Sequence, residues 1–305
     1  MEFNTQLIAS DRFEGGFAPY VPAKHVPQYK KLLPNYKPSP EHSLRISRYM
    51  RDVGYVGAIG AASSGKNALI STALEIEPDI FTLLLSVTSR PKRRNNGVWE
   101  EEGENYYYRT HGEIINMLSE GEFIEAALIN KSQVSGQHVD HLQKAYRSKK
   151  IVLNEFEIAG AVQLRRIEPT WRGMTIVPDD PQLHQEVFAK RSGVPAGEMD
   201  DDMLTRNKTA IWELDGILRE REGYAPFVNR FVRSDNQEDI QASMAENAER
   251  FVRVAKQAKN RYEGHFDPSD FEHIANMRDF LIEHTGVSIE QINEERGHGN
   301  VLVAA

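Results

Sequence analysis

The chain has 305 residues, which is enough for one large or two modest domains with a substantial core. Its formal net charge of −8 argues against wholesale electrostatic binding to nucleic acid or to an anionic membrane. The absence of cysteine excludes disulfides and thiolate metal sites. The sequence contains no apolar signal core near residue 1 and no run long enough to cross a bilayer. We therefore expect a cytoplasmic protein that has neither nucleic acid nor a membrane as its partner.

The first 52 residues differ in composition from the rest of the chain. Prolines occur every few positions over residues 18–43, which predicts extended chain rather than regular helix. The stretch "EHSLRISRYMRD" (residues 41–52) predicts a short helix that leads into the first strand. Tyr and Leu side chains in such a segment usually pack on their own domain, so we favour an arm wrapped on the main domain. A segment that docks a protein partner is the alternative.

From about residue 53, short apolar strands alternate with helical patterns, which indicates an α/β fold with a parallel sheet. Strands are expected at 55–60, 81–89, 105–110, 123–130, 150–156, 174–178 and 227–235. Helices are expected at 66–76, 111–121, 137–149, 181–193 and 200–221. The acidic run 200–202 is typical of a helix N-terminus rather than of metal ligands. Residues from about 239 onward read as helical, and two short capped helices are expected within 267–295.

The stretch "GYVGAIGAASSGKNALISTAL" (residues 54–74) contains a candidate phosphate-binding loop. Gly60, Gly65 and Lys66 have the spacing G-x-x-x-x-G-K, between an apolar strand and a helix. This geometry would point backbone N–H groups and a helix N-terminus at a phosphate, with Lys66 as a mobile cation. A glycine-rich turn without a ligand is the alternative. The candidate ATP-binding residues are Gly60, Ser63, Ser64, Gly65, Lys66 and Asn67.

Asn67 stands where the motif has the Ser or Thr whose hydroxyl binds Mg²⁺. An amide oxygen can also ligate Mg²⁺, but a neutral amide is a weaker replacement. Elsewhere, His138 and His141 are three residues apart on an expected helix, and no third ligand of suitable spacing accompanies them. We therefore do not expect a zinc site there.

Further stretches resemble the guanylate kinase family, in the family's order, over roughly residues 54–235. "SVTSRPKR" (86–93) resembles S-x-T-T-R-x-P-R, and "GENYYY" (103–108) resembles G-x-D-Y-Y-F. "GEFIEAA" (121–127) resembles x-E-F-I-E-x-A, and "VLNEFEIAG" (152–160) resembles I-L-D-I-D-x-Q-G. "KRSG" with "DDDMLTRN" resembles the family's lid. The resemblance implies a P-loop kinase fold: a central parallel sheet flanked by helices, a small mixed α/β acceptor-nucleotide-binding insertion and a helical lid.

The same resemblance divides the chain. It implies an N-terminal extension at 1–52 and a guanylate-kinase-like domain at 53–238. Within that domain, the acceptor-binding subdomain is expected at about 86–138 and the lid at about 188–206. Residues 239–305 would form a C-terminal helical extension, which could, like the N-terminal one, contact a protein partner.

The resemblance also implies roles for individual residues. Arg90, Arg93 and Tyr106 would hold the phosphate of the acceptor nucleotide, and arginine suits a bidentate grip on phosphate. Glu125 would read the guanine edge, since a buried carboxylate needs donors. The other acceptor positions are Ser86, Gln137, Glu155 and Glu157. Lys66 and Arg206 would be the catalytic residues, because phosphoryl transfer requires cations around the moving group. The cofactors would be ATP and Mg²⁺.

Several positions depart from the family pattern. Ser89 replaces a threonine and Pro91 falls one place early. The family's glutamate after the second arginine falls at Asn96, and the acids of "WEEEGE" (99–104) arrive later, after an insertion. The position of the family's phosphate-binding tyrosine falls near Ser135, and that of its base-reading hydroxyl falls near Gln137. The position of its earlier lid arginine falls near Val187, where Lys190 and Arg191 are close by.

Three functions follow from this pattern. The first is ATP-dependent phosphorylation of a nucleoside monophosphate, most simply GMP or dGMP, and the retained Gly65–Lys66 pair favours it. The second is a protein-binding module like the guanylate-kinase-like domains of membrane-associated scaffolds, which the departures and the two extensions favour. The third is a kinase for another phosphorylated acceptor, such as a modified nucleotide, which the changes near Ser135 and Gln137 would fit.

Overall fold

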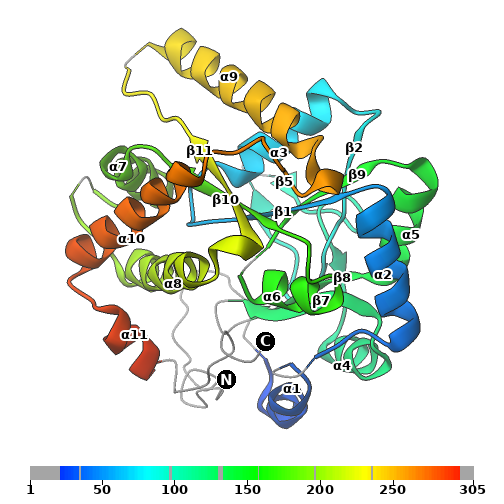
Figure 1. The fold of residues 1–305 in the computed structure, drawn as a ribbon. Coiled ribbons are helices and arrows are strands. Elements are labelled where there is room, and N and C mark those ends of the chain that lie inside the picture. Colours follow the sequence, from blue (N-terminus) through cyan, green and yellow to red (C-terminus); the bar gives the residue numbers. More distant parts are fainter. Residues whose placement is uncertain are drawn as a thin grey trace.

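The computed structural model describes residues 21–33, 36–95, 98–129, 133–156, 158–195, 197–234 and 236–295. A five-stranded parallel sheet lies at the centre, in the order β11-β10-β1-β9-β2. Its strands are β1 (Tyr55–Ile59), β2 (Phe81–Leu83), β9 (Ile151–Glu155), β10 (Gly173–Pro178) and β11 (Tyr224–Asn229). The central strands β1 and β10 are buried along their whole length, as expected for a sheet covered on both faces. Figure 1 shows the helices on either side of this sheet.

Alternate residues of the strands point into two separate cores. One core lies under α3 (Lys66–Ile76) and α9 (Gln237–Ala255), which pack on the face that carries Val56 and Ala58. The other core takes Tyr55 and Ile59 from the same strand. The helices over that second face are α2 (Pro40–Asp52), α5 (Val139–Ser148), α6 (Ile158–Ile167), α8 (Asp201–Arg219) and α10 (Phe271–Thr285). The expected central parallel sheet flanked by helices is confirmed.

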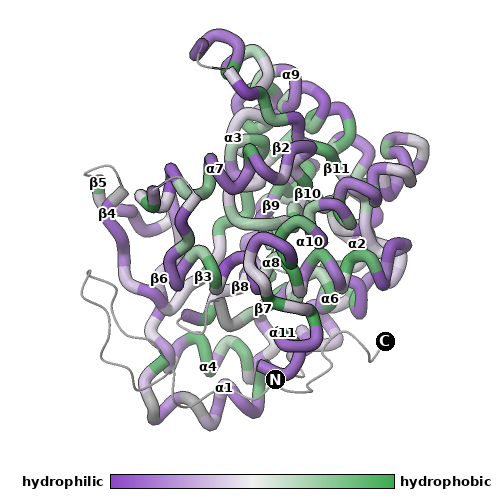
Figure 2. Tube along the Cα trace, turned by 90° about the vertical axis from the view of Figure 1, so that its left-hand side faces the viewer, coloured by the Kyte–Doolittle hydropathy of each residue, from purple (hydrophilic) through white to green (hydrophobic). Residues whose placement is uncertain are grey.

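A second, mixed sheet has the order β6-β3-β8-β7 and contains Glu125 and Gln137. Its strands are β3 (Val87–Thr88), β6 (Tyr107–Tyr108), β7 (Phe123–Ile129) and β8 (Gln133–His138), with α4 (His111–Glu120) between β6 and β7. A two-stranded hairpin, β4 (Arg94–Asn95) with β5 (Val98–Trp99), projects beside it. In Figure 2 this hairpin stands away from the body of the molecule.

Two predictions in this region were wrong. The single strand expected at 81–89 is divided between the two sheets, because the chain leaves the main sheet after Leu83 and Leu84 turns into the core. The helix expected at 137–149 begins only at Val139. Gln137 and His138 belong to β8, and the side chain of His138 caps the helix by accepting from Asp140 N. The two histidines therefore do not share one helix.

The N-terminal segment is more helical than its proline content predicts. Residues 23–25 form a 3-10 turn and α1 covers Val26–Leu32. Pro27 lies in the first turn of α1, where the missing N–H costs nothing. α1 packs on α4, and the hydroxyl of Tyr36 lies 2.7 Å from both the N and the O of Phe123. Val21, Tyr29, Leu33 and Tyr36 thus pack on the mixed sheet and α4. The helix expected at 41–52 is present as α2, which packs over the main sheet.

The remaining elements complete the domain. α7 (Pro181–Ser192) precedes α8, and short 3-10 turns lie at Arg221–Gly223, Ala258–Asn260 and Pro268–Asp270. β11 covers Tyr224–Asn229, so the strand expected at 227–235 begins and ends earlier. The C-terminal pair consists of α10 and α11 (Ile289–Glu295), and α10 is longer than the short helix expected there. Both pack against α8. In the described ranges, no helix is both long and apolar enough to span a bilayer.

Candidate active site

The phosphate-binding candidate, which we call the donor loop (residues 60–67), joins the end of β1 to the start of α3. Gly60 has a φ of 147°, and a side chain there would place its Cβ 2.3 Å from the carbonyl oxygen of Ile176. Gly65 has a φ of 91°, and its Cβ would lie 2.3 Å from Nδ2 of Asn229. Both positions therefore require glycine, for backbone conformation and for space.

Lys66 begins α3, and its side chain folds back over the donor loop. Its Nζ donates to the carbonyls of Gly60 (2.6 Å) and Ala61 (2.9 Å), and it lies 3.3 Å from Oε1 of Glu155. Lys66 is only 7 % exposed, so the charge is held in the loop rather than free in solvent. Since Lys66 is the first residue of α3, its charge lies at the helix N-terminus, where an anion would bind.

Two other loop carbonyls are held by side chains from distant elements. Ala62 O lies 2.7 Å from Nε2 of His184 on α7, and Ser64 O accepts from Nδ2 of Asn229 at 2.9 Å. The N–H groups of the first turn of α3 have no partner inside the helix, so they are available to an anion. That arrangement suits a phosphate.

The loop side chains also fit a polyphosphate. The hydroxyls of Ser63 and Ser64 are buried and, within the described part of the chain, have no hydrogen-bond partner. A buried hydroxyl without a partner is costly, and phosphate oxygens would satisfy both. Asn67 is exposed on the first turn of α3, where its amide oxygen can reach Mg²⁺ bound to such a phosphate. No group of three or more His, Cys, Asp or Glu in the described ranges could hold a metal ion.

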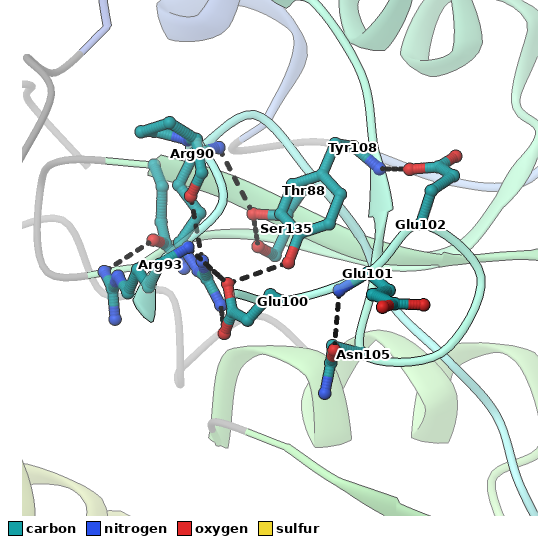
Figure 3. A network of polar contacts seen from close by, with 11 residues as sticks. Thr88, Arg90, Arg93, Glu100, Glu101, Glu102, Asn105, Tyr108 and Ser135 are labelled. Atoms are coloured by element: carbon teal, nitrogen blue, oxygen red, sulfur yellow. Dashed lines mark hydrogen bonds and ion pairs between the residues drawn. The ribbon is translucent and has the colours of Figure 1, made fainter. Parts of the chain in front are cut away.

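The acceptor side is built around a charged network that we call the acceptor cluster: Arg90, Arg93, Glu100, Tyr106 and Tyr108. Arg90 forms a bidentate ion pair with Glu100, at 2.5 and 2.7 Å, and both side chains are buried. Glu100 also accepts from the backbone N of Arg93 and from the hydroxyl of Tyr108, each at 2.8 Å. Figure 3 shows this carboxylate between the two arginines and the tyrosine.

Glu100 was not among the predicted site residues. The insertion that separates it from Arg93 is the β4–β5 hairpin, which Glu100 N closes by donating to Arg93 O at 2.9 Å. The hairpin returns the chain to the arginines, so a carboxylate seven residues later still reaches them. Although burial alone would raise it, the hydrogen bonds from Arg90, Arg93 N and Tyr108 lower the pKa of Glu100 to about 2. The acidic run at 100–102 was the available signal.

Tyr106 and Arg93 complete the cluster. The guanidinium of Arg90 lies 4.5 Å from the ring centroid of Tyr106, a cation–π contact. The side chain of Arg93 is exposed by surface area, and its guanidinium lies 3.4 Å from Oε1 of Gln133. Partial desolvation by the surrounding protein, with the positive charge of Arg90 nearby, lowers the pKa of Arg93.

The expected base-reading residues lie on the mixed sheet. Glu125 on β7 is 5 % exposed, and its carboxylate packs so closely on α6 that a Cβ at Gly160 would lie 2.7 Å from it. Gln137 on β8 is also buried; its amide donates to Ser86 Oγ at 3.0 Å. Gln163 on α6 pairs with both backbone groups of Ala126, which fixes the strand beside Glu125.

The remaining predicted residues have different surroundings. Glu155 ends β9 and faces Lys66, so its ion pair belongs to the donor loop as much as to the acceptor side. Arg206 on α8 is exposed and forms an i,i+4 ion pair with Asp202 at 2.8 Å. Glu157 and Asn96 lie outside the described residues. Lys190 and Arg191 are exposed in the last turn of α7.

Comparison with known proteins identifies the family. Residues 55–222 match the family model for guanylate kinase. A guanylate kinase of Clostridium perfringens (strain 13) is 27 % identical over 183 residues, covering 59 % of this chain and 75 % of that protein. One from Synechococcus sp. (strain JA-3-3Ab) is 33 % identical over 107 residues, covering 35 % and 46 %. The crystal structure of a guanylate kinase from Anaplasma phagocytophilum aligns with a TM-score of 0.46 at 18 % identity, over 79 % of this chain and 100 % of that chain. Since the family model spans more than half of the sequence, this chain belongs to the guanylate kinase family.

Proposed function

We propose that this protein transfers the γ-phosphoryl group of ATP to a nucleoside monophosphate, GMP or dGMP, and so forms ADP and the nucleoside diphosphate. The observation that carries the proposal is the donor loop. Side-chain donors hold four of its carbonyls, so its backbone N–H groups and Lys66 are available to a polyphosphate. Besides holding two loop carbonyls, Lys66 places a positive charge at the helix N-terminus, which phosphate binding requires and partner docking does not.

The acceptor cluster supplies the second half of the reaction. Two phosphate-bearing molecules repel one another, so the site must bring cations to both. Arg93 would bind the acceptor phosphate together with Arg90, whose guanidinium lies over the ring of Tyr106. Glu100 keeps the guanidinium of Arg90 in one orientation through its bidentate contact. Arg206, exposed on α8, would contact the transferred group.

ATP and Mg²⁺ fit the residues that are present. ATP supplies the phosphoryl group, and Mg²⁺ shields its negative charge. Lys66 would exchange its loop carbonyls for phosphate oxygens, and the hydroxyls of Ser63 and Ser64 would donate to them. Asn67 can offer one neutral oxygen to the metal, so the phosphates and water would provide most of the ligands.

Glu125 is the basis for proposing guanine as the base. Its buried carboxylate can accept two hydrogen bonds, which matches the N1–H and the amino group of guanine. The donors of Gln137 are directed at Ser86, which leaves the serine hydroxyl free to donate to a base oxygen. Adenine offers neither N1–H nor a ring carbonyl.

The proposal is tested by thermal shift with ATP and a panel of nucleoside monophosphates, with and without Mg²⁺. A ligand that binds the folded chain raises the melting temperature by mass action, whatever the turnover. We expect shifts with ATP and with GMP or dGMP, and a smaller shift with AMP. A shift with another phosphorylated compound alone would favour a different acceptor. No shift with any nucleotide would contradict the proposal and favour a protein-binding module.

A further inference from the structure

His184 contacts the donor loop from outside the phosphate-binding motif. It lies in the first turns of α7, is fully buried, and places Nε2 2.7 Å from the carbonyl oxygen of Ala62. The rings of Phe188 and Phe231 lie 6.3 and 6.2 Å from its own ring, so aromatic side chains flank this contact. Ala62 itself is half-buried, and His184 supplies the donor to its carbonyl from within this apolar setting.

The neighbours of the ring fix which nitrogen carries the proton. Nδ1 of His184 lies 3.2 Å from Nε2 of Gln185, an amide nitrogen that can only donate. Nδ1 must therefore accept, and the proton must be on the Nε2 that faces Ala62. Burial, together with the nearby charge of Lys66, lowers the pKa of His184 to about 4, so the neutral ring is the form present at neutral pH.

The same network extends to the helix that carries Arg206. Gln185 and Asn207 form a reciprocal amide pair, at 3.2 and 3.0 Å, and both are buried. The second amide hydrogen of Asn207 points to the sulfur of Met199 at 3.9 Å. Every donor in this chain of contacts thus has an acceptor, from the donor loop through α7 to α8.

Phosphate binding by a loop requires that its carbonyls face away from the anion. Lys66 can hold Gly60 O and Ala61 O only until it turns to a phosphate, and Asn229 holds Ser64 O from the sheet. Ala62 O has its side-chain donor in His184, which does not belong to the loop and need not move when a ligand arrives. Without that donor, the peptide could rotate and present its oxygen to the phosphate.

We propose that His184 is a positioning residue for the donor phosphates. By holding the Ala62 carbonyl, it keeps the loop N–H groups directed at the anion. Through Gln185 and Asn207, it also links the donor loop to α8, the helix that carries Arg206. The proposal rests on the proposed function in one respect, namely that the anion is the polyphosphate of ATP.

The test compares His184→Gln with His184→Met. Glutamine and methionine are both unbranched and similar in size, and only glutamine can place an N–H donor near the position of Nε2. Affinity for ATP, measured by calorimetry without Mg²⁺, should fall about tenfold in His184→Met and stay within about threefold in His184→Gln, because only methionine leaves the Ala62 carbonyl without its donor. Affinity for GMP should be unchanged in both variants. In steady state, the KM for ATP should rise while the KM for GMP does not.

Amide ¹H–¹⁵N spectra of the free protein provide a readout that needs no nucleotide. We expect the signals of residues 61–66 to shift in His184→Met and to stay near their original positions in His184→Gln. If both variants shift these signals equally, or neither does, His184 does not position the loop. If the unmutated protein fails to bind ATP while the spectra behave as expected, the proposed function fails and the positioning role stands.

Discussion

The donor loop and the acceptor cluster solve the same problem, binding a phosphate, in different ways. The donor loop relies on backbone N–H groups, and side chains from α7 and β11 hold two of its carbonyls. The acceptor cluster relies on side-chain charge, and its members all lie within one short stretch, residues 90–108. A backbone site depends on distant residues that keep the peptides in place, whereas a side-chain site depends on the few charges that compose it.

This difference predicts how each site responds to substitution. Loss of a charge should damage the acceptor cluster locally and leave ATP binding intact. Exchange of a loop side chain such as Asn67 should matter less, because the peptides rather than that side chain contact the anion. Lys66 is the exception, since it serves both as a charge and as the donor to two loop carbonyls.

The largest effect is expected for Lys66→Ala. It removes the cation aimed at the transferred phosphoryl group and the donor to Gly60 O and Ala61 O. Turnover should fall by about a thousandfold or more, as when a transition-state charge is deleted. A coupled assay for ADP measures it. Lys259→Ala, at an exposed lysine of a 3-10 turn, is the matched control and should retain full activity.

Arg90→Ala and Arg93→Ala should separate the two sites. Each should raise the KM for GMP by on the order of a hundredfold, as for loss of a charge-assisted contact with the phosphate, with the affinity for ATP unchanged. The two should differ in stability. Arg90→Ala leaves the buried Glu100 without its main partner and should cost about 3 kcal/mol in the free energy of unfolding.

Arg93 is exposed, so its removal should cost little stability. Urea denaturation of both variants, beside steady-state kinetics, checks this pair of expectations. Equal loss of ATP affinity in the two variants would remove both residues from the acceptor site.

Glu125→Gln should alter the choice of base. A carboxylate accepts two hydrogen bonds from guanine, whereas an amide replaces one acceptor with a donor. We expect the kcat/KM for GMP to fall by about ten- to a hundredfold, as for a buried unpaired group, and the kcat/KM for AMP to fall much less. An identical response to GMP and AMP would mean that Glu125 does not read the base. Glu104→Gln, at an exposed glutamate, serves as the control.

Glu100 should also make stability depend on pH. Its pKa is about 2 in the folded chain and near 4.5 when unperturbed, so its contribution is complete above about pH 5 and is lost as the pH falls toward 2. Glu100→Gln should abolish that part of the dependence, which amounts to at most about 3 kcal/mol. The free energies of unfolding of the unmutated protein and of Glu100→Gln, measured between pH 2 and pH 7, test this. Parallel curves over that range would be inconsistent with the ion pair.

Asn67→Ser should have the smallest effect. Serine restores a hydroxyl ligand for Mg²⁺ and is a good residue at a helix start. Turnover should stay the same or rise by about two- to fivefold, with a stronger dependence on Mg²⁺, because the metal gains one ligand. Titration of activity with Mg²⁺ measures it. A large loss of turnover would show that the asparagine has a role of its own.

The sequence allowed the main sheet to be predicted, because its strands are short apolar runs between helical patterns. The β8 strand could not be predicted in the same way, since Ser135, Gly136 and Gln137 give it little apolar character. α1 was missed because its proline occupies the first turn, where proline is tolerated. In these cases local composition carried little information, and packing on neighbouring elements decided the structure.

The residues of the candidate site also divide into those that the sequence pattern predicts and those that only the folded chain reveals. Gly60, Gly65 and Lys66 have a spacing that indicates their role directly. Glu100 was hidden by the hairpin that separates it from Arg93, and its role depends on how the chain returns. His184 lies 122 residues from Ala62 in the chain, and no pattern near either residue indicates the contact.

Phosphoryl transfer itself is the most direct test of the account. The protein would be incubated with ATP, GMP and Mg²⁺, and the nucleotides separated and quantified over time. We predict ADP and GDP in equal amounts, formed by the unmutated protein and not by Lys66→Ala. ATP and GMP that remain unchanged, in a preparation shown to be folded, would contradict the account.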